Sequence, residues 1–277
     1  MHPILFNLFG LPLHMYGLSI ALGFLLIVYL MQRDFGKLGI SADDISEMAF
    51  GVLLVGAAGT RLLHIIMFPQ DYSLSDPIGW IAVWRGGLVF QGALFTAIPY
   101  AWWALRKRGI PFWLAADHAL PYVPIAQAFG RMGCFFNGCC YGEPTDVPWG
   151  LSFPPGSPVA GSYPDPAGTG WSMHVHPTQL YSVVLLLTMS GLMLFLRGRW
   201  TPFIGYMFPL YFVFYGIKRF IVECFRGDHN PTNLGAGVLS NQQVICVAMI
   251  IIGAAAFALL KKFLSLIHIS EPTRPER

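Results

Sequence analysis

The sequence predicts an all-α integral membrane protein with about seven transmembrane helices. Hydrophobic residues make up 55% of its 277 residues, charged residues only 11%, and the mean hydropathy is +0.56. A soluble domain carries roughly 25% charged residues. With so few charges, most of the outer surface has to face lipid. The net charge of +3 comes without a Lys/Arg-rich block, so no nucleic-acid partner is expected.

Seven apolar runs are candidate spanning helices, since crossing a bilayer takes about 20 residues. They cover residues 16–31, 48–68, 86–105, 112–129, 180–196, 203–222 and 244–260. Several contain proline or polar residues, so we expect their boundaries to shift by a few positions. No small-residue cleavage site follows the first run, which predicts a retained helix rather than a signal peptide.

Between the fourth and fifth runs lies a segment of different composition. Residues 131–176 are rich in Gly, Pro, Cys and Asn, which predicts a folded extracytoplasmic insertion rather than a span. We expect residues 1–264 to form a single transmembrane catalytic domain that includes this insertion. Residues 265–277 contain two prolines and do not continue the pattern, so they are predicted to be a disordered or non-native tail.

Basic residues in short loops predict the orientation in the membrane. One side collects Arg33, Lys37, Arg106, Lys107, Arg108, Arg197, Arg199, Lys261 and Lys262. The opposite side holds the 131–176 segment, with its acidic residues, and the stretch around Asp228. We therefore expect the N-terminus and the insertion outside the cytoplasm and the C-terminus inside.

Charged residues inside spanning regions are costly and mark candidate functional positions. They are Arg61, Asp117, Arg131, Arg219 and Glu223. Arg131 lies among glycines, where a guanidinium can hold an anionic head group in a two-point fork, although an arginine at a membrane boundary can also simply snorkel. Arg219 and Glu223 are four residues apart and share a helix face, which predicts an ion pair. Two arginines near one membrane face suit a phosphodiester.

Five blocks resemble the prolipoprotein diacylglyceryl transferase family. They are residues 15–18 (MYGL), 85–92 (RGGLVFQG), 130–142 (GRMGCFFNGCCYG), 176–181 (HPTQLY) and 215–226 (YGIKRFIVECFR). One Gly-Arg-x-Gly run is weak evidence, whereas five blocks in the family's order on a seven-helix frame are specific.

The resemblance implies an enzyme of the bacterial cytoplasmic (inner) membrane with its active site toward the outer face. It transfers the diacylglyceryl group of phosphatidylglycerol to the lipobox cysteine thiol of a preprolipoprotein, forming a thioether and releasing glycerol phosphate. Expected partners are phosphatidylglycerol, the preprolipoprotein signal peptide and membrane lipid. No cofactor is expected.

By the same resemblance, three residues carry the chemistry. Arg131 and Arg219 bind and polarise the phosphate as the C–O bond breaks, and Glu223 orients Arg219. The expected substrate-binding residues are Tyr16, Gln91, Asn137, Gly142, His176 and Tyr215.

Gln91 stands where many members carry a histidine considered to be a general base. Glutamine exchanges no proton near neutral pH. Either base catalysis is not essential, or His176 or Glu223 replaces it, or the arginines themselves favour the thiolate. The last interpretation is preferred.

Two cysteines also depart from the family. Cys134 and Cys139 stand where many relatives carry asparagine and glutamate, so the roles of those side chains do not carry over. With Cys140, His174 and His176 they offer metal-ligating atoms, but the spacing matches no common zinc pattern. We expect no metal and interpret them as small buried thiols, with a disulfide as the alternative.

A transporter or lipid flippase is the competing function class, since it also uses charges within helices. Transporters usually contain two corresponding halves, and the first and last three helices show no such repeat. The candidate residues also gather toward one membrane face rather than the midplane. The enzyme is therefore the preferred interpretation.

Overall fold

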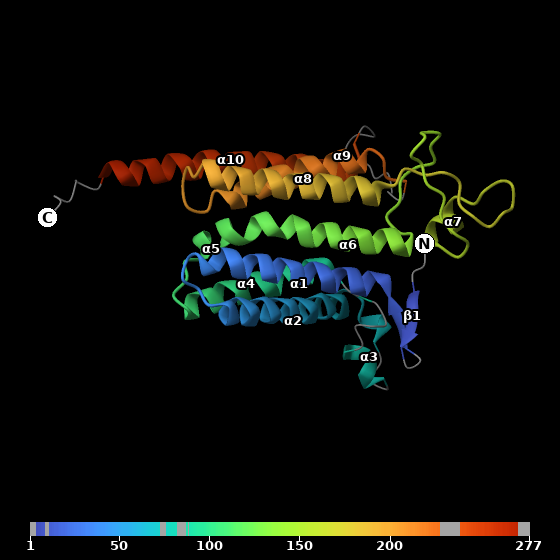
Figure 1. The fold of residues 1–277 in the computed structure, drawn as a ribbon, viewed down its shortest axis with the longest axis horizontal. Coiled ribbons are helices and arrows are strands. Elements are labelled where there is room, and N and C mark those ends of the chain that lie inside the picture. The colour runs from blue at the N-terminus through green and yellow to red at the C-terminus, as the bar shows by residue number, and fades with distance from the viewer. Residues whose placement is uncertain are drawn as a thin grey trace. The chain divides into compact units, whose positions relative to one another are not determined.

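The computed structural model describes residues 4–8, 11–72, 76–81, 87, 89–227 and 239–270. Within these ranges the protein is helical (Figure 1), apart from an antiparallel hairpin of β1 (Ile4–Leu8) and β2 (Leu11–His14) and isolated bridges in the loops. The predicted all-α fold class is thus confirmed in its main feature.

Each of the seven predicted runs overlaps a helix of 15 residues or more. They are α1 (Met15–Gly36), α2 (Ala42–Met67), α4 (Phe90–Lys107), α6 (Val123–Asn137), α8 (Thr178–Arg199), α9 (Met207–Glu223) and α10 (Asn241–Ser270). The short elements are the 3₁₀ turns η1 (Pro69–Asp71) and η3 (Leu120–Tyr122) and the helices α3 (Pro77–Ile81), α5 (Phe112–Ala119) and α7 (Pro158–Ser162).

Four of the described helices are long and apolar enough to cross a membrane: α1, α2, α8 and the part Asn241–Lys262 of α10. Large apolar side chains are exposed on the helices, as with Leu54 at 68% and Phe95 at 73%. Such surfaces are stable against lipid rather than water, so the protein is a membrane protein. Helix α9 has 17 residues and α6 has 15, fewer than a span normally needs, and seven transmembrane helices stay a prediction.

The fourth predicted run, residues 112–129, is not one continuous helix. It consists of α5, the turn η3 and the start of α6. Pro121 and Pro124 lie at this break, and because proline lacks a backbone N–H it cannot continue an α-helical hydrogen-bond ladder.

The predicted start of the insertion at residue 131 is wrong, because α6 continues to Asn137. Gly133, which suggested a loop, serves packing instead: a Cβ there would lie 2.8 Å from Cδ2 of Tyr16 in α1. The helix ends where Gly138 adopts φ 67°, a left-handed conformation that glycine adopts without steric cost. The irregular segment therefore starts at Gly138.

That segment is folded, as the sequence predicted. Tyr141, Phe153, Val159 and Val175 form a small buried core within it. Its position outside the membrane stays a prediction.

The predicted tail begins as helix. Helix α10 runs to Ser270, where a sequence without Gly or Pro continues it, and the predicted disorder of the tail stays a prediction. Residues 271–277 lie outside the described part of the chain, and a non-native origin of the tail stays a prediction.

The chain divides into two compact units, each described by itself: a larger unit of residues 1–27 and 116–277, and a smaller unit of residues 28–115. A single domain over residues 1–264 therefore stays a prediction.

In the smaller unit, buried Arg61 has a structural role. Its Nε donates to the carbonyl of Trp80 at 3.2 Å and its Nη1 to that of Gly87 at 3.1 Å, and Nη2 bonds the carbonyl of Gly79. The guanidinium also lies 4.9 Å from the centre of the Tyr72 ring. These contacts fasten the connection after α2, so this charged residue stabilises the fold.

In the larger unit, buried Asp117 fixes the start of α9. Its carboxylate accepts from the N–H of Gly205 at 2.6 Å and from the N–H of Met207, the first residue of the helix, at 2.9 Å. The first N–H groups of a helix have no partner within it, and a negative charge there opposes the positive end of the helix dipole. Asp117 is thus a helix cap, and neighbouring Met189, Met193 and Met207 form a buried core.

Replacing Asp117 should destabilise the protein. Asp117→Ala removes two charge-assisted hydrogen bonds and leaves two buried N–H groups without an acceptor, so we expect a loss of about 3 kcal/mol in unfolding free energy. Urea or thermal unfolding in detergent measures it. Asp146→Ala, at an exposed carboxylate, is the matched control and should change stability by less than about 0.5 kcal/mol; equal stability of the two variants would contradict the capping role.

Candidate active site

The candidate site residues of the larger unit gather at one end of its helices. Figure 1 shows α6 ending, α8 beginning and α9 ending at the same end, beside the irregular segment with α7. An antiparallel bridge joins Gly142 of that segment to Arg226 after α9. Chain segments far apart in sequence therefore meet at this end of the unit.

The central interaction is a buried ion pair on α9. Nη2 of Arg219 lies 3.0 Å from Oε2 of Glu223, and Nε of Arg226 lies 4.0 Å from the same oxygen. The Glu223 side chain is only 1% exposed, and its other oxygen accepts from Oγ of Ser240 at 3.4 Å. The ion pair predicted from the four-residue spacing is present, with Arg226 as a second cation.

Arg131 of α6 belongs to the same group of charges. Its charge acts on both Arg219 and Lys218. Lys218 is 4% exposed, and its Nζ lies 5.6 Å from the centre of the Tyr215 ring. We call Arg131, Lys218, Arg219, Arg226 and Glu223 the arginine cluster.

The arginine cluster contains four basic side chains and one carboxylate, so positive charge is in excess. Nη1 of Arg219 is buried and has no hydrogen-bond partner in the described part of the chain. Buried donors normally have a partner, and burying a charge needs compensation. An anion with several oxygen acceptors is the ligand that this arrangement fits.

Lys218 and Arg226 were missed in the reading of the sequence. Helix α9 ends at Glu223, so helical spacing does not place Arg226; its position follows from the turn after the helix and the bridge to Gly142. Lys218 had a signal, because a lysine inside an apolar run is rarely buried without a function or a partner.

Tyr16 and Tyr215 are near the arginine cluster, as expected for head-group contacts. Tyr16 packs against Gly133, two residues after Arg131 in α6, and the Arg131 charge acts on it. The ring of Tyr215 faces Lys218. Asn137 is the exposed last residue of α6 and interacts with the side chain of Cys139. The larger unit thus contains all the candidate residues except Gln91.

Gly142 and His176 have positions that hold the backbone together. The N–H of Gly142 donates to the carbonyl of His176 at 3.0 Å, and the N–H of Glu143 donates to that of Phe225 at 3.0 Å. Residues 141–143 therefore lie between the two neighbouring segments. A Cβ on Gly142 would lie 2.5 Å from the Phe225 carbonyl oxygen, so only glycine fits.

His176 points toward an apolar groove. Its Nδ1 is hydrogen-bonded to Oη of Tyr181 at 3.0 Å, and its ring packs edge-on against Phe225 at 5.2 Å. The groove has a volume of about 490 Å³. Its lining consists of Trp149, His176, Leu180, Tyr181, Val184, Leu185, Ile221, Val222 and Phe225.

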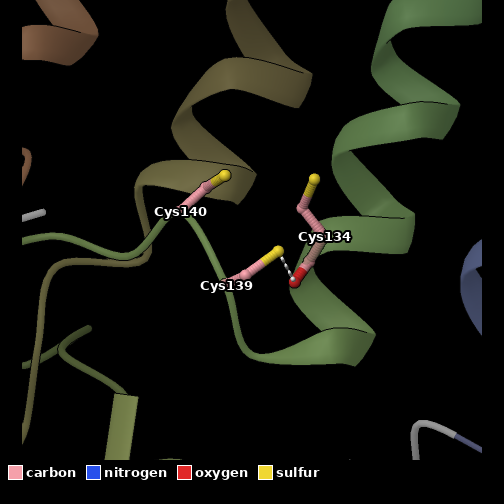
Figure 2. Close-up of side chains that lie close together, drawn as sticks. All are labelled: Cys134, Cys139 and Cys140. Atoms are coloured by element: carbon pink, nitrogen blue, oxygen red, sulfur yellow. Dashed lines mark hydrogen bonds between the residues drawn. The ribbon is translucent and has the colours of Figure 1, made fainter. Parts of the chain in front are cut away.

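The three cysteines of the 130–142 block lie together. Their sulfur atoms are all within 4.8 Å of one another (Figure 2), and each of the three is a free thiol, so the alternative of a disulfide does not apply in this structure. Hydrogen bonds with the Cys134 and Cys139 thiols, and the charges of Arg131 and Arg226, lower the pKa of the Cys140 thiol.

Gln91 is the one candidate residue in the smaller unit. It is exposed in the first turn of α4, and its role stays a prediction. In the 85–92 block that contains it, residues 85, 86 and 88 lie outside the described residues, as do Asp228 and the rest of the loop after α9.

Comparison with known proteins identifies relatives over nearly the whole chain. The family model described as "Prolipoprotein diacylglyceryl transferase" matches residues 3–259. The phosphatidylglycerol–prolipoprotein diacylglyceryl transferase of Geobacter sulfurreducens is 34% identical over 262 residues, which are 94% of this chain and 95% of the relative. That of Clostridium tetani is 35% identical over 257 residues, 93% and 97% of the two chains. That of Vibrio cholerae is 33% identical over 259 residues, 91% and 88%.

The tight position of Gly142 makes a direct prediction. Gly142→Ala places a methyl group against the backbone of two segments, which cannot move aside without breaking their hydrogen bonds. We expect a loss of about 2 kcal/mol or more in unfolding free energy, as for overpacking elsewhere. Gly161→Ala, where a Cβ meets nothing within 4 Å, is the control and should be neutral; unfolding curves of the two variants that coincide would refute the packing argument.

Proposed function

The chain belongs to the prolipoprotein diacylglyceryl transferase family, and on that basis we propose that its arginine cluster performs the transfer named in its relatives. That reaction moves the diacylglyceryl group of phosphatidylglycerol to a prolipoprotein. The chain is a transferase of lipoprotein biosynthesis in the bacterial inner membrane. A transporter is not favoured, because the relatives are named as transferases.

The observation that carries the proposal is the buried guanidinium of Arg219. Glu223 holds it by Nη2, while Nη1 makes no hydrogen bond within the described residues. Phosphatidylglycerol offers phosphodiester oxygens that can accept from this nitrogen and from Arg131. Two arginines binding one phosphate fix its orientation as well as its charge.

The same arginines stabilise the leaving group. When the bond between the diacylglyceryl carbon and the phosphate oxygen breaks, its electron pair stays on that oxygen, and glycerol phosphate gains a second negative charge. Donors that are already in place for this charge lower the barrier without reorganising. Glu223 acts as a positioning residue, since it holds Arg219 through an ion pair that is closed to water.

The attacking group is the lipobox cysteine thiol, which loses a proton as its sulfur forms the new C–S bond. Glu223 already pairs with Arg219 and accepts from Ser240, and an ion-paired carboxylate is a poor proton acceptor. His176 is hydrogen-bonded to Tyr181 beside the apolar groove. Both substitutes for the missing histidine are therefore engaged, which supports the alternative that nearby positive charge favours the thiolate.

Tyr16, Asn137 and Tyr215 are proposed to line the head-group pocket. Tyr16 and Tyr215 each lie beside a cation of the arginine cluster, where a phenol can donate to a phosphate or glycerol oxygen. For Gly142 and His176, the contacts support a different role in the same site, because their backbone pairing holds the segment next to Arg226.

Both substrates come from the bilayer, so the site needs access from lipid. The groove between α8 and α9 has an almost entirely apolar lining and includes Val222 and Phe225, which flank the Glu223 position in sequence. We propose that it receives an acyl chain of the lipid while the phosphate reaches the arginine cluster. Apolar contact is the main source of affinity for such a chain.

Seven transmembrane helices with the site toward the outer face remain the proposed topology. In the larger unit, Arg197 and Arg199 lie in the last turn of α8, and the arginine cluster lies at the end where α8 begins. Positive loop residues favour the cytoplasm, which supports an N-terminus and a 138–177 segment outside it and a cytoplasmic C-terminus.

Removing either arginine should abolish turnover. Arg131→Ala and Arg219→Ala should each lower kcat by about 10³-fold or more with phosphatidylglycerol and a lipobox peptide, because each loses a donor to the developing charge. Release of glycerol phosphate and formation of the thioether are the measurements. Arg199→Ala, at an exposed arginine of α8, should keep full activity. Turnover in both site variants would refute the assignment, and a folded wild type without any turnover would refute the function.

Filling the groove should weaken lipid binding. Val184→Trp projects an indole into the groove lining and should raise KM for phosphatidylglycerol about 10-fold with little change in kcat, the pattern of lost uniform binding. Leu187→Trp, also exposed on α8 but outside the groove, is the matched control. An unchanged KM in Val184→Trp would exclude the groove as the acyl-chain site.

A further inference from the structure

The three-cysteine group beside the arginine cluster has no part in the reaction as described so far. Cys134, Cys139 and Cys140 each offer one sulfur atom, and these atoms lie within 4.8 Å of one another. We propose that they are the protein ligands of a thiophilic divalent metal ion, of the zinc class, whose open fourth position takes the thiol of the prolipoprotein substrate. The second half of this proposal rests on the proposed function.

The end of α6 brings the first two sulfurs together. The N–H of Gly138 donates to the carbonyl of Phe135 at 3.2 Å, and the N–H of Cys139 donates to that of Cys134 at 3.1 Å, which is the Schellman ending of a helix. This turn reverses the chain, so Cys139 lies over the last helical turn, with its Sγ 3.7 Å from the Cys134 carbonyl oxygen (Figure 2).

The backbone of Cys140 brings in the third sulfur. Cys140 has φ 61° and is the one residue other than glycine with a positive φ among the described residues. This conformation costs of order 1–2 kcal/mol in an L-residue, and such strain persists where surrounding contacts impose it. It turns the Cys140 side chain toward the region that the Cys134 side chain faces, as Figure 2 shows.

Two buried side chains at the start of α8 hold this loop in place. Oγ1 of Thr178 donates to the carbonyl of Cys140 at 2.7 Å, and Nε2 of Gln179 donates to that of Cys139 at 2.8 Å. Thr178 is 1% and Gln179 0% exposed. The three thiols are thus presented by a rigid backbone rather than by a loose loop, as a preformed ligand set requires.

The distances between the three sulfur atoms are close to those that a bound zinc ion requires. Three thiolates around zinc, at about 2.3 Å each and in tetrahedral directions, lie roughly 3.8 Å apart. The sulfurs already lie within 4.8 Å of one another. Small side-chain rotations that move each sulfur by about 1 Å or less would bring them to the zinc-binding distances. The spacing of the cysteines along the sequence did not indicate a metal site, because the turn after α6 determines how far apart their sulfur atoms lie.

Neighbouring charges balance such a centre. Three thiolates and a divalent ion carry one net negative charge, and the charges of Arg131 and Arg226 act on Cys140. Three protein ligands leave one tetrahedral position open, which is the arrangement of catalytic rather than structural zinc sites.

A substrate thiol in that position would replace the absent general base. Binding releases the thiol proton to water and leaves a metal-held thiolate. Its sulfur then forms the C–S bond to the diacylglyceryl carbon as the C–O bond breaks and the electron pair goes to the phosphate oxygen. Nucleophile and leaving group are joined through a single carbon, so the site has to lie next to the phosphate-binding arginines. Arg131 and Cys134 lie three residues apart on α6, on the same face of the helix, and so meet this requirement.

Metal binding is tested on the purified full-length chain with Cd²⁺ as the probe, through its thiolate charge-transfer band in the ultraviolet. We expect one Cd²⁺ per chain in the wild type and loss of the band in Cys134→Ser and in Cys140→Ser. Cys224→Ser and Cys246→Ser, whose sulfurs are outside the three-cysteine group, should keep it. A wild type without the band, or a band that survives Cys140→Ser, would overturn the metal site.

The substrate step is tested by the pH profile of turnover. Cys140→Ser should be at least 10-fold slower than the wild type at pH 7. Its rate should recover as the pH rises toward the thiol's usual pKa of about 8.5, because the substrate thiol then ionises without the metal. A merely structural role would lower the rate equally at all pH values, and that result would overturn the thiol-activating role. If the protein turns over substrate but shows no Cd²⁺ band, only the metal-site proposal is refuted. If it shows the band but no turnover, only the proposed transferase function is refuted.

Discussion

The charge balance around Glu223 is the constraint on which the site depends. A carboxylate that is 1% exposed in a lipid-facing bundle is tolerable only with cations in contact, since an unpaired buried charge costs several kcal/mol. Arg219 provides that compensation from the same helix and Arg226 from the turn that follows it. Arg131 and Lys218 then add positive charge that no described carboxylate neutralises, and the excess gives the site affinity for an anion. Glu223 therefore stabilises and orients the arginine cluster. Because it neutralises only part of the positive charge, the cluster can still bind phosphate.

Close backbone approach makes this arrangement possible. Glycine at 133 lets Tyr16 lie against α6, and glycine at 142 lets the irregular segment pair with residues on both sides. Each contact ties an element of the site to a segment distant in sequence. The chain around the family blocks at residues 130–142 and 215–226 therefore meets through backbone hydrogen bonds as well as through the charged side chains.

Hydropathy predicted the helices well, because apolar runs of spanning length have few alternatives in a membrane. The predicted helix boundaries were wrong where a residue type occurs both in loops and within helices. Gly133 suggested a loop and instead serves helix packing, and the prolines at 121 and 124 divide a run that composition alone joins. The Arg219–Glu223 pair followed from helical periodicity. Arg226 lies beyond the end of α9 and was not predicted. Arg61 and Asp117 bind backbone groups, which no spacing rule reveals.

The cysteines show the limit of spacing rules most directly. Metal-site patterns assume that the ligands' separation along the chain determines their separation in space, and this holds only within one type of turn. Here a left-handed Gly138 and a left-handed Cys140 reverse the chain within three residues. That reversal brings the three sulfurs together at the end of α6, the helix that carries Arg131. One helix ending thus serves both halves of a displacement reaction: it presents sulfur ligands for the nucleophile next to an arginine for the departing phosphate. The attacking sulfur and the departing oxygen have to reach the same carbon, so the two functions need to be neighbours in space, and residues a few positions apart at one helix end achieve this.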